Sequence, residues 1–181
     1  MLHASSLNYW LNSYVLKPKR KQLIGVIIPS NIPLVGFYDF LCVLISGNIF
    51  VGKLSSSNNI LLPYVAKLLY DLNLDFKKYI FFKDKLENID LLIATGSDNS
   101  VDYFNALFGD IPKVLRKNRN SVAVLIGDED QNSYTSLSHD IFMYFGLGCR
   151  SISKLFLPHS ISLNSFKKTL ESYSSIMLNK N

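Results

Sequence analysis

Short runs of branched apolar residues alternate with amphipathic stretches along most of the chain, and this alternation constrains the fold more than any other feature. The runs that predict strands lie at residues 23–28, 49–54, 79–82, 90–94, 121–126 and 155–157. A strand that is apolar at consecutive positions is typical of a parallel sheet that is buried on both faces. Strand and helix in regular succession therefore predict an α/β fold with a doubly wound parallel sheet.

The stretches between the strands carry apolar residues at helical spacing. They predict helices over residues 1–16, 33–46, 55–72, 99–108, 133–145 and 163–177. Pro33 is expected in the first turn of its helix, where the missing N–H group costs nothing. The serines at residues 55–57 are expected to cap the helix that follows them.

The composition agrees with a folded protein that binds anions. Of the 181 residues, 48% are hydrophobic and 18% are charged, which provides a core and argues against disorder. A formal net charge of +5 favours the phosphates of a cofactor, a nucleic acid or a membrane surface. The run at residues 17–21 is basic, and we interpret it as a solvated linker rather than a phosphate site.

The sequence also predicts whether the chain crosses a membrane and in which compartment the protein is found. Residues 23–52 are mostly apolar and contain no Lys or Arg. Prolines and polar residues such as Pro29, Asn31 and Asp39 interrupt this stretch, so no membrane span is expected. The N-terminus has no signal-peptide pattern. The two cysteines are far apart in sequence, which favours reduced thiols and a cytoplasmic protein.

Ligands of an open α/β sheet bind beyond the carboxyl ends of its strands, and four such ends carry polar turns. These turns lie at residues 29–33, 53–57, 95–100 and 127–130. A helix N-terminus after one of them would favour phosphate, because its free N–H groups point at the ligand. Neither standard glycine-rich nucleotide motif occurs, and the histidines have no metal-ligand spacing, so no metal site is predicted.

Cys149 is the candidate nucleophile, flanked by Gly148 and Arg150. The alternative role is that of a buried small hydrophobic side chain, which is the usual one for a single cysteine. Cys42 lies between apolar neighbours in a predicted helix and is expected to pack in the core. Spacing alone leaves both roles open for Cys149.

Four segments resemble motifs of the aldehyde dehydrogenases, in the same order and at similar intervals. Residues 28–33 resemble the proline–aromatic–asparagine turn, and residues 46–53 resemble the glycine–asparagine strand that ends in lysine. Residues 94–97 resemble the threonine–glycine–serine turn, and residues 146–149 resemble the glycine-x-x-cysteine nucleophile. Each match is weak alone, whereas the four together are specific.

Three further segments are more similar to one branch of that superfamily. Residues 31–37, 116–125 and 144–150 resemble the acyl-CoA reductases, a group that includes the fatty-acid reductase of bacterial bioluminescence. The resemblance extends from about Leu7 to Pro158. It implies an aldehyde-dehydrogenase-like, Rossmann-like domain at residues 1–116 and part of a catalytic domain at residues 117–181.

The resemblance also implies a reaction and its residues. The Cys149 thiolate would attack a long-chain fatty acyl-CoA, and hydride from NADPH, with NADH as the alternative, would reduce the acyl-cysteine to an aldehyde. Asn31 and the backbone N–H of Cys149 would bind the oxyanion. Lys53 and Ser55 would contact the adenosine ribose or its phosphate. The nucleotide would contact six residues in all: Pro29, Ser30, Lys53, Ser55, Gly96 and Ser97.

Two departures from the superfamily pattern bear on activity. Residues 116–119 replace the glutamate–leucine–glycine–glycine stretch whose glutamate activates water, which favours reduction over hydrolysis. Family members are longer at both ends, so a second copy or a complementing chain is expected to complete the catalytic domain. The alternative is an inactive, truncated nucleotide-binding remnant. Nucleic-acid binding rests on charge alone, and no module for it is predicted.

Overall fold

The computed structural model describes residues 3–14, 20–57, 59–117, 119–159 and 163–178. The chain divides into two compact units, Met1–Lys117 and Asn118–Asn181. Among the described residues, no helix is both long enough and apolar enough to cross a lipid bilayer.

The first unit contains a five-stranded sheet whose order is β3-β2-β1-β4-β5, with every neighbouring pair parallel. Its elements are α1 (Ala4–Leu11), β1 (Leu23–Ile28), α2 (Phe37–Ile45), β2 (Ile49–Leu54), α3 (Leu61–Leu72), a 3₁₀ turn (Leu74–Lys78), β3 (Ile80–Phe82), β4 (Leu91–Thr95), α4 (Asp98–Leu107) and β5 (Lys113–Arg116). The predicted doubly wound parallel sheet is confirmed.

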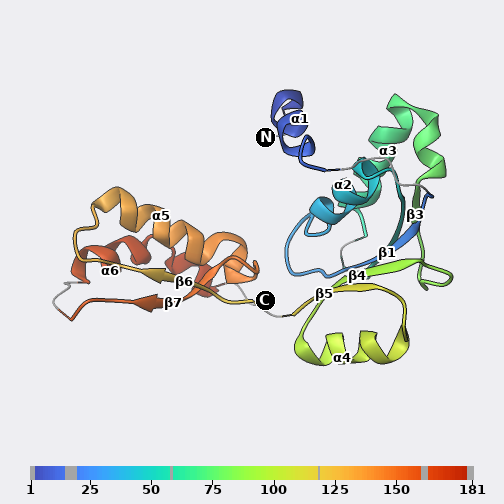
Figure 1. Ribbon diagram of the computed structural model, residues 1–181. Coiled ribbons are helices and arrows are strands. Elements are labelled where there is room, and N and C mark those ends of the chain that lie inside the picture. Colours follow the sequence, from blue (N-terminus) through green and yellow to red (C-terminus); the bar gives the residue numbers. More distant parts are fainter. Residues whose placement is uncertain (1–2, 15–19, 58, 118, 160–162, 179–181) are drawn as a thin grey trace. The chain divides into compact units, whose positions relative to one another are not determined.

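Helices cover both faces of this sheet, because alternate residues of each strand point to opposite sides. Phe40 of α2 and Leu62 of α3 share one buried cluster with Val26 and Phe50. On the other face, Leu92 and Ala94 of β4 pack in a cluster with Phe104 of α4 and with Phe108, the residue that follows this helix. Figure 1 shows α2 and α3 on one side of the sheet and α4 on the opposite side.

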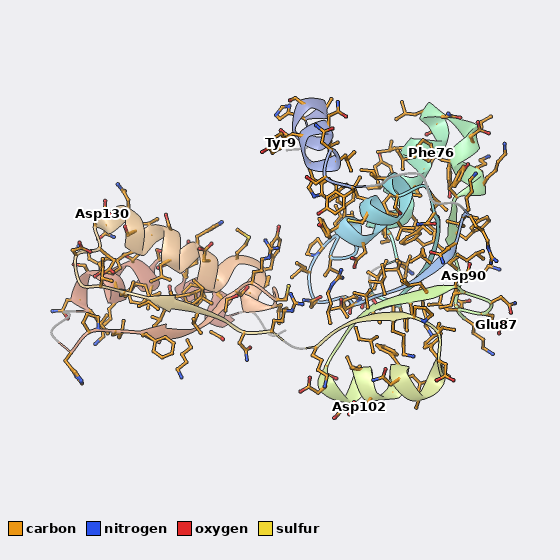
Figure 2. The ribbon with its side chains drawn as sticks, viewed as in Figure 1. Tyr9, Phe76, Glu87, Asp90, Asp102 and Asp130 are labelled. Atoms are coloured by element: carbon orange, nitrogen blue, oxygen red, sulfur yellow. The ribbon has the colours of Figure 1, made fainter. Side chains whose placement is uncertain are left out.

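The connection from β3 to β4 covers part of the sheet without a helix. Leu86 and Ile89 pack against Gly25 in the central strand β1, where an added Cβ would lie 2.6 Å from Ile89 Cδ1. Only glycine leaves room for this close approach. At the start of β4, Asp90 accepts a hydrogen bond from the backbone N–H of Leu23 (2.8 Å) and pairs with Arg20 (3.0 Å), and Figure 2 shows its position on the sheet.

The second unit pairs a small sheet with two helices. Its elements are β6 (Ser121–Val124), α5 (Gln131–Phe142), a 3₁₀ turn (Met143–Gly146), β7 (Ile152–Phe156), α6 (Asn164–Glu171) and a second 3₁₀ turn (Ser174–Leu178). Strands β6 and β7 are parallel. The core contains Leu125, Leu137 and Phe166. The outward residues of the sheet, Val124 and Phe156, are exposed.

The helix boundaries differ from the predictions where the backbone turns away from helical geometry. The first helix ends at Leu11 rather than residue 16, and none of its residues is buried. The second begins at Phe37 rather than Pro33, because Leu34 is left-handed (φ 53°). Residues 15–19, which include most of the basic run, lie outside the described residues.

The bounds of three further helices differ from the predictions, and one strand was not predicted. The serines at 55–57 do not cap α3, whose N-cap is Ile60 with no side-chain hydrogen bond. Helix α5 begins at Gln131 because Asp130 caps it, and it ends at Phe142. The last helix ends at Glu171, and β5 was not predicted at all.

Candidate functional site

The candidate site lies at the carboxyl edge of the five-stranded sheet, where the strand order changes direction. The chain passes from β1 outward through β2 to β3, and then crosses back to place β4 on the other side of β1. The turn after β1 (residues 29–33) and the turn after β4 (residues 96–97) therefore lie beside each other at this switch point. In doubly wound sheets a dinucleotide binds in the crevice at this position.

A pocket of about 340 Å³ lies at the turn after β1 and the segment before α3. It is lined by Ser30, Asn31, Ile32, Pro33, Ser57, Ile60 and Leu61. The lining combines hydroxyl and amide groups with aliphatic side chains, as small-molecule sites do. Two of the predicted site residues, Ser30 and Asn31, are therefore brought together, and Ser57 of the predicted polar turn 53–57 joins them in the pocket lining.

The turn that carries Asn31 is held against the end of β1. Gly36, the N-cap of α2, approaches Ile28 so closely that an added Cβ would lie 2.7 Å from its Cδ1 atom. Asn31 is half-buried, and its side-chain carbonyl oxygen is buried within the turn. An oxyanion needs a donor, so only the amide nitrogen of Asn31 could serve the predicted role.

The turn after β4 leads directly into the N-terminus of α4. Ser97 caps this helix, and its Oγ accepts a hydrogen bond from the backbone N–H of Ser100 (3.2 Å). The N–H of Gly96 donates to the carbonyl of Arg116 (3.1 Å), which fixes the turn to β5. An added Cβ at Gly96 would lie 2.8 Å from Ser100 Cβ, so glycine is required here. Free N–H groups at the start of a ten-residue helix suit a pyrophosphate.

Lys53 and Ser55 occupy the end of β2 and the residues after it. Lys53 is exposed and pairs with Ile27 of β1, which contacts the cluster beneath α4. The Lys53 side chain therefore lies on the same face of the sheet as α4. No acidic residue occurs at residues 53–57, where many NAD-binding sheets place one for the ribose hydroxyls. A nicotinamide dinucleotide thus fits the residues present.

An ion pair that sequence patterns did not predict spans the same edge. The guanidinium of Arg116 donates to both carboxylate oxygens of Asp39 (2.7 and 2.8 Å). These hydrogen bonds raise the pKa of Arg116 above its ordinary value. One sequence feature could have indicated this ion pair, namely the acidic residue Asp39 within the apolar stretch of α2. A buried carboxylate needs a cationic partner, and Asp39 is buried.

Cys149 lies in the second unit, in an exposed turn before β7. The N–H of Ser151 donates to the carbonyl of Gly148 (2.9 Å) across it. The three residues 144–146 adopt left-handed conformations (φ 53°, 59° and 71°), which is unusual for Tyr and Phe. Because the thiol is exposed, the alternative role of a buried packing residue is wrong. Cys42, in contrast, is half-buried, and burial raises the pKa of its thiol.

Comparison with solved structures identifies the fold. An indole-3-acetaldehyde dehydrogenase of P. syringae, solved with NAD+ and IAA, has a TM-score of 0.69 at 18% identity, over 84% of this chain. An aldehyde dehydrogenase of Bacillus cereus, solved with NAD+, has a TM-score of 0.68 at 20% identity, over 86% of this chain. A glyceraldehyde-3-phosphate dehydrogenase of Methanocaldococcus jannaschii, solved with NADP, has a TM-score of 0.70 at 19% identity, over 87% of this chain.

The chain spans about a third of the length of these proteins, namely 34%, 35% and 38%. At such identities the likeness establishes the aldehyde dehydrogenase fold. No curated protein matches the sequence. The family model of the acyl-CoA reductases (LuxC), however, matches residues 13–174, which cover most of both units. The chain therefore belongs to the acyl-CoA reductase (LuxC) family.

Proposed function

We propose that this chain takes part in the reduction of a long-chain fatty acyl-CoA to the aldehyde, with Cys149 as nucleophile and NADPH bound at the carboxyl edge of β1, β2 and β4. The observation that carries the proposal is the exposed thiol of Cys149, on a tight turn, in a chain of this family. Residues 1–116 would bind the nucleotide, and residues 117–181 would form the part of the catalytic domain that carries the nucleophile.

The first step would be transfer of the acyl group to the protein. The thiolate of Cys149 attacks the thioester carbonyl carbon, the carbonyl oxygen becomes an oxyanion, and the bond from carbon to the CoA sulfur breaks as CoA leaves. The amide N–H of Asn31 and the backbone N–H of Cys149 stabilise that oxyanion, because charge develops there only in the transition state.

The second step would release the product. A nicotinamide nucleotide, when bound, would supply the hydride that reduces the acyl-cysteine to the aldehyde, and the bond from carbon to the Cys149 sulfur would break to return the thiolate. The residues that would hold it are Ser30 with Pro29 beside the nicotinamide end, Gly96 with Ser97 at the pyrophosphate, and Lys53 with Ser55 at the adenosine ribose. NADPH is preferred over NADH in this proposal, because the end of β2 presents a lysine and no acidic residue.

A reductase must prevent water from hydrolysing the acyl-cysteine. The carboxylate of Asp39, at the same edge of the sheet, is bound by both terminal nitrogens of Arg116 and is not available as a base for water. The proposal of reduction rather than hydrolysis rests on residues 116–119, which lack the glutamate that activates water in the superfamily pattern. We further propose that the protein works in the cytoplasm, as an oligomer or together with a partner chain.

Acylation tests the proposal directly. The purified chain is mixed with palmitoyl-CoA and its intact mass is measured, with Cys149→Ala as the test variant and Cys42→Ala as the matched control. We expect one acyl adduct on the unmodified chain and on Cys42→Ala, and none on Cys149→Ala. A folded chain that gains no adduct, or an adduct that persists in Cys149→Ala, would show that Cys149 does not carry this chemistry.

A further inference from the structure

One face of the small sheet formed by β6 and β7 (Figure 1) is apolar and exposed to solvent. On the other face, Leu125 is buried against side chains of α5 and α6. Val122 and Val124 alternate with the inward residues of β6, and Ile126 follows the strand; their exposed fractions are 51%, 68% and 73%. Because β6 and β7 are parallel, and parallel sheets are normally covered on both faces, we expect this face to be covered in the assembled protein.

Strand β7 adds an aromatic ring to the same face. Lys154 is paired with Val122, and Phe156 is paired with Val124, so these side chains point to the same side of the sheet. The Lys154 ammonium group lies over the Phe156 ring, 4.9 Å from its centroid. Phe156 is 47% exposed, and it continues the apolar surface of β6. Val122, Val124, Ile126 and Phe156 together are called the outer patch.

The two ends of the outer patch carry opposite charges. Near the amino ends of the two strands lie three exposed cations, namely Arg119, Arg150 and Lys154. The turn that follows β6 is acidic and contains Asp128, Glu129 and Asp130. Among the described residues, none of these six side chains forms an ion pair. A second copy turned end for end would therefore place the basic end of each copy against the acidic end of the other.

We infer that two copies of this chain associate through the outer patch, with antiparallel strands, around a two-fold axis at Val124. In such a contact the same residues serve both copies, and positions equally far before and after Val124 lie opposite each other. Val122 of one copy then packs on Ile126 of the other, and Arg119 lies opposite the acidic turn at residues 128–130. The axis repeats this pairing at the other end of the patch. This association is separate from the proposed reduction and does not depend on it.

The size of the outer patch sets the expected affinity. From Val122 to Ile126 it is about 13 Å long, and it is two strands wide. It is therefore smaller than the roughly 800 Å² that each partner buries in a standard interface. We expect a dimer with a micromolar dissociation constant rather than a permanent one. The charges at the two ends favour the antiparallel orientation, because the parallel one would bring like charges together.

Sedimentation velocity of the full chain, from about 1 to 300 μM, tests this inference across the expected range of affinity. The test variant is Val124→Asp, and Val114→Asp is the matched control, because Val114 is an exposed valine on β5 of the first unit. We expect Val124→Asp to weaken the dimer by about tenfold or more, since two carboxylates would be buried together at the axis. Val114→Asp should leave it unchanged, and circular dichroism checks that both variants fold.

Charge reversal tests the antiparallel arrangement at exposed positions where folding is not at risk. Arg119→Glu and Asp128→Lys should each weaken the dimer, because each places like charges together at both ends. The double variant should recover the affinity, and so should an equimolar mixture of the two single variants. A chain that stays monomeric at every concentration, or a dimer that Val124→Asp does not weaken, would overturn the inference. Losses that add in the double variant instead of cancelling would overturn it as well.

Discussion

The ion pair between Asp39 and Arg116 allows a quantitative test of how the first unit is held together. The Asp39 side chain is 11% exposed, whereas 30% of the Arg116 side chain is exposed. This asymmetry decides which partner is more costly to remove. In Asp39→Asn the guanidinium can regain water, and the lost charge-assisted hydrogen bonds cost about 1–2 kcal/mol. In Arg116→Met a carboxylate stays buried without its partner, which costs about 3 kcal/mol.

Urea unfolding measures these costs in the first unit. Trp10 is the single tryptophan, and its ring contacts Tyr38, the neighbour of Asp39 in α2 (centroids 6.3 Å apart), so its fluorescence reports on this unit. The double variant removes both charges, and we expect it to be more stable than Arg116→Met alone.

The ranking of the two variants is the critical result. If Asp39→Asn destabilises the unit more than Arg116→Met, the burial asymmetry does not govern the pair. If both variants cost less than about 0.5 kcal/mol, the contact behaves as a surface ion pair and contributes little to the carboxyl edge. Either finding would refute the reasoning.

Three further predictions concern single sites. Iodoacetamide should alkylate the exposed Cys149 before the half-buried Cys42, whose pKa is raised by burial; peptide mapping over time checks the order, and equal rates would contradict it. Hydrogen bonds at the N-cap of α5 lower the pKa of Asp130, so its contribution to stability should be present above the ordinary value of 3.8 and lost as the pH falls below it; an Asp130→Ala variant should lack this part of the acid unfolding curve. Replacing Tyr144 or Phe145, both left-handed and exposed, by glycine should raise the free energy of unfolding by about 1 kcal/mol in urea, and a decrease would show that their side chains stabilise the turn.

The buried strands of the sheet could be predicted because their signal is local. A run such as residues 23–28 is apolar at every position, and only a strand with two covered faces buries it all. The edge strand β5 has no such signal, because the sequence Lys113–Arg116 carries charge at both ends and is only half-buried. It becomes a strand through pairing with β4, which lies elsewhere in the chain.

Part of the candidate site could also be predicted from local sequence signals. Lys53, Gly96 and Ser97 follow recognisable strand ends, so their place at the carboxyl edge follows from the order of elements. The partnership of Asp39 with Arg116 joins residues 77 positions apart, and no local pattern indicates it.

The position of Gly25 in the central strand bears on the order in which the strands associate during folding. Strand β1 is completed on one side by β4, and the hydrogen bond between Leu23 and Asp90 that joins their starts closes a separation of 67 residues. Contacts so distant in sequence form late, because the entropy of the intervening chain is lost before they contribute. Leu86 and Ile89 reach Gly25 in that same closing step. We therefore expect β1, β2 and β3 to associate first, so that a newly made chain acquires its switch point only when the second half of the sheet docks.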